Sequence, residues 1–262
     1  MTDRDDILNC VVTGQVRCGA AVVQSSVHSH PDATCHPDLL HADEKTRQAN
    51  HECYFGKRRD PEEPNSYFGS SCEVSAEQYL NTVVLDNPCH GERVIGVKVL
   101  YPELHKHQLW EFLHERGNVG GFCCIHIYRN PVACFVSLCQ ARQSGVWHQD
   151  VNDRGTYDCP PPVDVSLRDL TRFVDWQLAN ETRLRAACED RLEITYKELF
   201  LNYREVMDGV FDFLELSSFA DVSAGFRRLK NRNMNDRIIN LAALKREATG
   251  DVLALLEGDD LF

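Results

Sequence analysis

The sequence lacks the features that would make a cysteine-rich chain a metal or disulfide protein. It has 12 cysteines among 262 residues, but no C-x-x-C pair, the spacing that zinc sites commonly use. Disulfide frameworks belong to short secreted chains, and this chain is long enough to bury a core without them. The densest histidine and cysteine stretch, residues 28–41, has no spacing that converges on one ion. We therefore expect buried, reduced cysteines and no metal site.

Long hydrophobic runs and an excess of positive charge are also missing. No apolar run approaches the roughly 20 residues of a membrane-spanning helix. The opening residues, MTDRDDILN, are acidic and polar, whereas a signal peptide is basic and then apolar. A formal net charge of −12 argues against a non-specific nucleic-acid binder, but it allows a local basic pocket. We expect a cytoplasmic protein that binds neither membrane nor nucleic acid, and we leave a homodimer open.

What the chain does contain is an alternation of apolar runs with amphipathic ones. Strands separated by helices form βαβ units and a mainly parallel sheet. The sequence therefore predicts one α/β domain over residues 1–262, with a P-loop-like, three-layer fold. The predicted strands are Ile7–Thr13, Val94–Leu100, Gly121–Tyr128 and Arg191–Tyr196. The predicted helices lie within Ala20–Val27, Pro102–Gly117, Pro131–Gly145, Asp164–Asp190 and Lys197–Leu216.

The loop after the first predicted strand, TGQVRCGAA, lacks the two side chains of a nucleoside-triphosphate loop. Gly14 and Gly19 have the spacing of a P-loop, but Ala20 and Ala21 stand where Lys and Ser or Thr would be. Glycine still lets backbone N–H groups approach a phosphate at the start of a helix. The candidate phosphate-binding residues of this loop are Gly14, Gln15, Val16, Arg17, Cys18, Gly19, Ala20 and Ala21.

A second candidate phosphate site follows the third predicted strand, in YRNPVACFVSL. Arg129 leaves the strand, and Ser137 lies two turns into the next helix. An arginine fork and a hydroxyl so placed can converge on one phosphate. The alternative is an arginine at the sheet edge and a serine on a helix face, which this spacing also allows. Lys98, at another strand end, is either a further cation at the same edge or a side chain that reaches solvent.

The two loops together, strand–G-x-x-R-x-G and then R-N-P-x-x-x-x-x-S about 110 residues later, resemble the sulfotransferases that use 3′-phosphoadenosine-5′-phosphosulfate (PAPS). SHPDATCHPDLL resembles the HP…GELL segment of the bacterial branch that includes the Nod-factor sulfotransferases. IGVKVL resembles its G-x-K strand, and QARQSGVW the stretch after its 3′-phosphate serine. ITYKELF resembles the family's Y-E-x-L, and VFDFLEL its FLG segment. The resemblance spans about residues 7–240.

This resemblance implies roles for particular residues. The first loop would cradle the 5′-phosphosulfate without magnesium, and Arg17 and Lys98 would balance the charge on the leaving phosphate. Arg129 and Ser137 would hold the 3′-phosphate, and Tyr196 would lie near the adenine.

The general base is a separate question. Asp38 matches the glutamate of GELL and is the first candidate. His36 is the rival, because an imidazole exchanges protons near neutral pH. Asp38 has a structural alternative as well, as the N-cap of a helix after Pro37.

The resemblance also extends to segments outside the two loops. FRRLKNRNMNDR, residues 226–237, resembles the C-terminal basic segment that closes over the nucleotide, which makes Arg228 and Lys230 candidate contacts. The alternative is a basic helix face. A polar excursion at residues 42–75 and the loop at 147–162 would bind the acceptor, a small metabolite or glycan with a hydroxyl or an amine.

Three functions remain open at this point. The first is sulfuryl transfer from PAPS, with 3′-phosphoadenosine 5′-phosphate (PAP) as the product. The second is a catalytically impaired protein that binds PAPS or PAP, because Ala20 and Ala21 lack hydroxyls whose hydrogen bonds are worth about 1 kcal/mol each. The third is a P-loop small-molecule kinase, which the missing Lys and Ser or Thr disfavour.

Overall fold

The computed structural model describes residues 7–41, 45–46, 75–85, 91–117, 120–147, 149–150, 160–224, 226–227 and 234–258. Its main sheet has five parallel strands in the order β2-β3-β1-β4-β6. These strands are β1 (Leu8–Gly14), β2 (Ala33–His36), β3 (Val94–Lys98), β4 (Phe122–Tyr128) and β6 (Arg191–Thr195). The mainly parallel α/β sheet predicted from the sequence is confirmed.

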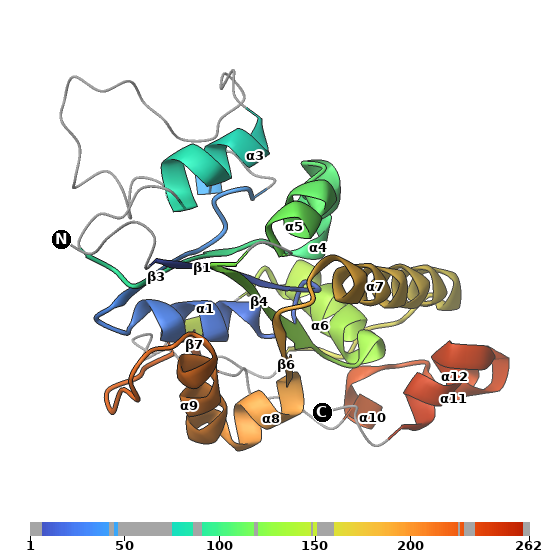
Figure 1. Ribbon diagram of the computed structural model, residues 1–262. Helices are drawn as coiled ribbons and strands as arrows, with labels where there is room; N and C mark the ends of the chain where they lie inside the picture. The colour runs from blue at the N-terminus through green and yellow to red at the C-terminus, as the bar shows by residue number, and fades with distance from the viewer. Residues whose placement is uncertain are drawn as a thin grey trace.

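Helices cover both faces of this sheet (Figure 1). On one side lie α1 (Ala20–His28), α8 (Tyr196–Leu201) and α9 (Tyr203–Phe213). On the other side lie α3 (Ala76–Tyr79), the π-helical segment η2 (Leu80–Leu85), α4 (Tyr101–Lys106) and α5 (Trp110–Gly117). Adjacent strand residues face opposite layers, so Cys123 packs with α1 and α9 while Cys124 packs with α4 and α5. The two cysteines therefore lie in opposite layers of the core.

A third hydrophobic cluster lies beyond β4 and β6. It joins α6 (Pro131–Ser144), α7 (Leu167–Ala187) and α12 (Gly250–Glu257). Asn130 caps α6 by accepting hydrogen bonds from the N–H groups of Val132 and Ala133, so the position of this helix relative to β4 is fixed at its first turn. The remaining elements are β5 (Gln149–Asp150), β7 (Phe226–Arg227), α10 (Met234–Arg237) and α11 (Leu241–Glu247).

Several predicted boundaries were wrong. Ala33–His36 forms the edge strand β2, which was not predicted, so the described sheet has one strand more than predicted. The helix predicted over Pro102–Gly117 is two helices, and Gln108 between them has a left-handed φ of 56°. The helix predicted over Lys197–Leu216 is likewise interrupted at Asn202. Tyr196 begins α8 instead of ending a strand, because Thr195 caps that helix.

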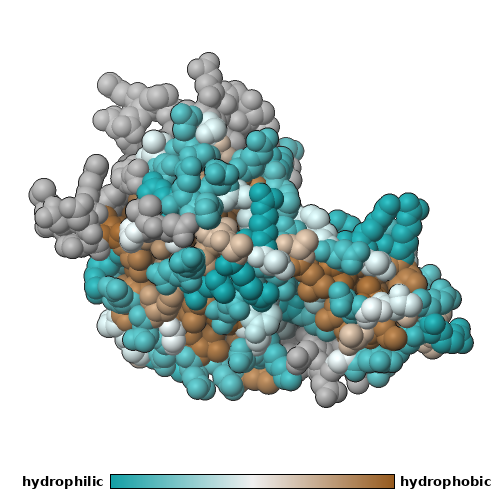
Figure 2. Space-filling model, turned by 45° about the vertical axis from the view of Figure 1, so that its right-hand side comes forward, coloured by the Kyte–Doolittle hydropathy of each residue, from teal (hydrophilic) through white to brown (hydrophobic). Residues whose placement is uncertain are grey.

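The surface fits an acidic, hydrophilic chain with a mean hydropathy of −0.38. The face in Figure 2 carries hydrophilic side chains over most of its area, with hydrophobic side chains in patches between them. No described helix is long and apolar enough to cross a membrane. Eight cysteines fall in the described part of the chain; all are free thiols, and all but Cys139 are buried.

Candidate functional site

The loop between β1 and α1 depends on its two glycines. Gly14 has a φ of 152°, and a Cβ there would lie 2.2 Å from the carbonyl oxygen of Ile127 on β4. Gly19 has a φ of 100°, and a Cβ there would lie 3.2 Å from side-chain carbons of both Tyr196 and Leu199. Arg17, between them, has a left-handed φ of 70°. A side chain at either glycine would displace the loop from β4 and α8, so the glycine spacing in the sequence reflects close packing.

Arg17 connects this loop to the second candidate phosphate site. Its Nε donates a hydrogen bond to the Ser137 hydroxyl on α6 at 3.2 Å, and its guanidinium also donates to the carbonyl of Trp147. Arg129 donates from Nη1 to the carbonyl of Arg17 at 3.0 Å. Burial and the neighbouring Arg129 guanidinium lower the pKa of Arg17 from its usual value. Two guanidinium groups and a hydroxyl, far apart in the sequence, therefore meet at one place.

Arg129 is held from three sides. Its side chain is only 5% exposed, and its guanidinium carbon lies 3.8 Å from the centroid of the Tyr196 ring. This cation–π contact orients the guanidinium over α8. Gln177, buried on α7, donates to the Arg129 carbonyl at 2.9 Å. The Arg129 fork is therefore fixed by its surroundings, as a recognition group should be.

The end of β3 carries a partly buried ion pair. Lys98 Nζ lies 2.7 Å from Asp38 Oδ2, and the two side chains are 5% and 22% exposed. A turn follows Asp38, in which its carbonyl accepts from the N–H of His41, so Asp38 does not act there as the N-cap of a helix. His36 is buried at the end of β2 and is not among the residues that line the cavity described below.

Glu103, predicted from the sequence only as part of a helix, lies beside this ion pair. It is 7% exposed on the first turn of α4, and its Oε2 accepts from the Leu100 N–H at 2.6 Å. Burial and the charge of Asp38 raise the pKa of Glu103 to about 7, while the Leu100 N–H and Lys98 act in the opposite direction. The carboxyl therefore titrates near neutral pH.

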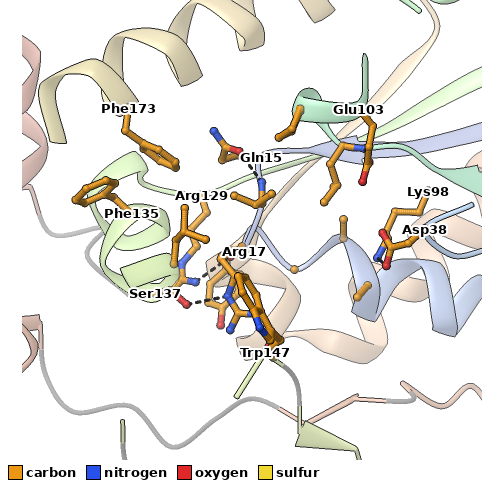
Figure 3. Close-up of a pocket in the computed structure, with 18 of the residues that line it drawn as sticks. Gln15, Arg17, Asp38, Lys98, Glu103, Arg129, Phe135, Ser137, Trp147 and Phe173 are labelled. Atoms are coloured by element: carbon orange, nitrogen blue, oxygen red, sulfur yellow. Dashed lines mark hydrogen bonds and ion pairs between the residues drawn. The ribbon is translucent and has the colours of Figure 1, made fainter. Parts of the chain in front are cut away.

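One cavity of about 790 Å³ is bordered by Arg17, Arg129, Ser137, Asp38, Lys98 and Glu103, but not by His36. Figure 3 shows Arg17, Arg129 and Ser137 in one part of it and Asp38, Lys98 and Glu103 in another. Aromatic rings from α6 and α7 add an apolar wall, in which Phe135 and Phe173 have ring centroids 5.2 Å apart. Among the described residues, six cations line the cavity against three carboxylates; the cations are Arg17, Lys98, Lys106, Arg129, Arg142 and Arg172.

The arrangement suits a polyanionic ligand with an aromatic part. Cations outnumber carboxylates here although the chain carries a formal net charge of −12. The loop presents the start of α1 with Ala20 and Ala21 on the cavity wall, and a helix N-terminus favours phosphate. Burial raises the pKa of Cys18 to about 11, although the Ala20 N–H and Lys98 lower it. Its thiol therefore stays protonated at neutral pH, which makes it a poor nucleophile.

The structure thus gathers most of the predicted site residues. The cavity lining includes Gln15, Val16, Arg17, Gly19, Ala20, Ala21, Asp38, Lys98, Arg129, Ser137 and Tyr196. Gly14 and Cys18 shape the loop from behind it. Arg228 and Lys230 lie outside the described residues, as do most of the polar excursion at 42–75 and of the loop at 147–162. In the described part of the chain, no group of three His, Cys, Asp or Glu side chains could hold a metal ion.

No protein-family model matches the sequence, and no curated protein sequence matches it. Among solved structures, the chain is similar to a sulfotransferase from Alicyclobacillus acidocaldarius, with 16% identity, a TM-score of 0.48, and coverage of 95% of this chain and 94% of that one. It is also similar to the sulfotransferase STF9 from Mycobacterium avium, with 14% identity, a TM-score of 0.43, and coverage of 83% and 65%. A third similar structure is mouse sulfotransferase SULT7A1 complexed with PAP, with 13% identity, a TM-score of 0.39, and coverage of 99% and 75%.

Proposed function

We propose that this protein is a sulfotransferase that moves a sulfuryl group from PAPS to a hydroxyl or an amine of a small metabolite or glycan. One observation carries the proposal. The glycine loop and the Arg129–Ser137 segment, which resemble the two phosphate-binding segments of PAPS-dependent enzymes, are joined through Arg17 at 3.0 and 3.2 Å. A ligand with phosphate groups at two separate positions fits such a pair of sites.

Each part of the cavity then has a task. Arg129 and Ser137 would bind the 3′-phosphate, with Tyr196 beside the adenosine. The backbone of residues 15–19 and the start of α1 would bind the 5′-phosphosulfate. PAPS supplies the sulfuryl group and a good leaving group. As the leaving phosphate gains negative charge, Arg17 and Lys98 would stabilise that charge.

The absent hydroxyls at Ala20 and Ala21 leave the backbone and the cations to bind the phosphosulfate. The six cations that line the cavity support binding without magnesium. Asp38 pairs with Lys98 at 2.7 Å, which places it to orient that ammonium, and it stays a candidate for the general base.

Calorimetry with PAP and, separately, with ATP and magnesium tests the proposed ligand. We expect PAP to bind and ATP with magnesium to bind far more weakly, because ATP has no 3′-phosphate to engage Arg129 and Ser137. The Arg129→Ala variant should bind PAP roughly 10- to 100-fold more weakly, since hydrogen bonds to a charged group contribute about 1.5–3 kcal/mol. Tight binding of ATP with magnesium, and no response to PAP, would overturn the proposal.

Arg183→Ala is the matched control for this experiment. Arg183 also stacks on an aromatic ring, with its guanidinium carbon 4.6 Å from the Trp110 centroid, but it does not line the cavity. We expect its PAP affinity to equal that of the unmodified protein. Equal affinities for the two variants would mean that the 3′-phosphate site is misplaced. In a separate assay, transfer of label from radiolabelled PAPS to a panel of hydroxyl and amine compounds would identify the acceptor.

A further inference from the structure

Two carboxylates reach the part of the cavity around Lys98, and their surroundings differ. Asp38 Oδ2 forms an ion pair with the Lys98 ammonium at 2.7 Å. Glu103 accepts a hydrogen bond through Oε2, from the N–H of Leu100 at 2.6 Å. Among the described residues, its Oε1 has no hydrogen-bond donor, and Figure 3 shows the side chain pointing from α4 into the cavity. The hydrogen bond at Oε2 therefore orients Glu103, and its Oε1 is available to accept a hydrogen bond from a ligand.

We propose that Glu103 is the general base that takes the proton from the acceptor. This inference rests on the proposed sulfotransferase function and adds to it the identity of the proton acceptor. The acceptor oxygen or nitrogen forms a bond to the sulfur, and the bond from sulfur to the 5′-phosphate oxygen of PAPS breaks. The acceptor proton moves to Glu103 Oε1, PAP leaves with the electron pair, and Glu103 then releases the proton to solvent.

The electrostatic surroundings of Glu103 suit this task. Burial and the Asp38 charge hold the pKa of its carboxyl at about 7, with the Leu100 N–H, Lys98 and Lys106 opposing them. His41, Asp169 and Arg172 line the same cavity. A base is most effective when it titrates near the working pH, because it is then both available and able to accept a proton. Lys98, on the same side of the cavity, would stabilise the charge that develops on the sulfuryl oxygens.

A structural alternative exists for Glu103. It is the third residue of α4, and its bond to the Leu100 N–H is the contact that glutamate or glutamine makes at the start of many helices. In α3 the same position holds Gln78, whose side-chain oxygen accepts from the Ser75 N–H at 3.1 Å. Glutamine can therefore make this contact, so Glu103→Gln should keep α4 in place and remove only the base.

The test compares the unmodified protein with Glu103→Gln, Asp38→Asn and Glu198→Gln. Glu198 makes the same helix-start contact in α8, with the N–H of Thr195 at 3.2 Å, but does not line the cavity. Excess enzyme is incubated with PAPS, water serves as the acceptor, and released PAP is measured from pH 5 to 9. We expect Glu103→Gln to lower the rate about 100-fold or more. It should also abolish the rise of the rate with pH around neutrality, while Glu198→Gln changes neither.

A second measurement does not depend on turnover. Calorimetry of PAP in buffers of different ionisation enthalpy reports protons taken up on binding. Because an anionic ligand favours the protonated form of a nearby carboxyl, we expect proton uptake near pH 7 that is lost in Glu103→Gln. Equal PAP release by the unmodified protein and Glu103→Gln, with PAP bound by both, would overturn the base assignment alone. If Glu103→Gln releases PAP as fast as the unmodified protein while Asp38→Asn loses this activity, the base is Asp38. If PAP does not bind at all, the sulfotransferase proposal itself is overturned.

Discussion

The burial of Glu103 has a consequence for stability that needs no ligand. Its carboxyl has a model-peptide pKa of 4.5, and burial together with Asp38 raises this pKa to about 7 in the folded protein. Between these two values the folded state binds more protons than the unfolded state. The stability that protonated Glu103 contributes is therefore complete below about pH 4.5 and is lost as the pH rises through about 7.

We expect Glu103→Gln to gain stability relative to the unmodified protein as the pH rises. The difference in the free energy of unfolding between the two should move by about 2.5 kcal/mol in favour of the variant from pH 5 to pH 8. Denaturant unfolding of both proteins at the two pH values measures it, and the double difference removes the contribution of other titrating groups. A difference that stays constant with pH would mean that the Glu103 carboxyl titrates normally in the fold.

At the scale of elements, α4 is anchored to the sheet by a buried hydrogen-bonded chain. The Tyr101 hydroxyl lies 2.7 Å from His126 Nε2 on β4, and His126 Nδ1 lies 3.1 Å from Glu193 Oε1 on β6. Burial lowers the pKa of His126 to about 4 although Glu193 opposes this shift. The imidazole is thus neutral, so Tyr101 donates to Nε2 and Nδ1–H donates to Glu193. This chain fixes the start of α4, two residues before Glu103.

Tyr101→Phe should destabilise the fold by about 1–3 kcal/mol, because it leaves the buried His126 Nε2 without a partner. Tyr128→Phe is the matched control on β4. It removes a hydroxyl that forms no hydrogen bond with any described residue, and we expect a change within about 0.5 kcal/mol. Chemical denaturation of both variants measures the effect. Equal stabilities would show that the Tyr101 hydroxyl does not anchor α4.

The elements also show how far the sequence could be interpreted. β1 and β4 are long apolar runs, and their burial follows from composition. β2 has only four residues, Ala-Thr-Cys-His, and forms at the sheet edge because Glu92 and β3 are beside it, which are contacts no local pattern reveals. The break at Gln108 depends on a single left-handed residue. Because that break separates α4 from α5, the sequence did not reveal the short helix on which Glu103 lies.

For the candidate site too, the sequence predicts some of the residues and not others. The sequence identifies Gly14, Gly19, Arg129 and Ser137, because a glycine loop and an arginine–serine pair that bind phosphate have characteristic spacings in the chain. The aromatic wall of Phe135 and Phe173 and the support of Arg129 by Gln177 come from α6 and α7 packing together. Such contacts depend on tertiary geometry, in which residues far apart in the chain meet. Their only signal in the sequence is the apolar stripe of α7, which is equally typical of an ordinary core helix.

For the whole molecule, the cavity joins parts that belong to different hydrophobic clusters. Its lining comes from the β1–α1 loop, β3, α4, α6, α7 and α8, and the three clusters divide these elements among them. A ligand that contacts all of them binds only the folded chain. Its binding energy is therefore added to the global stability.

PAP should therefore raise the thermal unfolding temperature of the entire chain. At 100 times its dissociation constant it contributes about 2.7 kcal/mol, which for a chain of this size corresponds to roughly 5–10 °C. A thermal melt followed by circular dichroism, with and without PAP, measures the shift. At the same PAP concentration, Arg183→Ala should show the full shift. Arg129→Ala should show at most half of it, because the weaker binding predicted for this variant reduces the ratio of ligand to dissociation constant. A full shift in Arg129→Ala would mean that PAP stabilises the fold from a site other than this cavity.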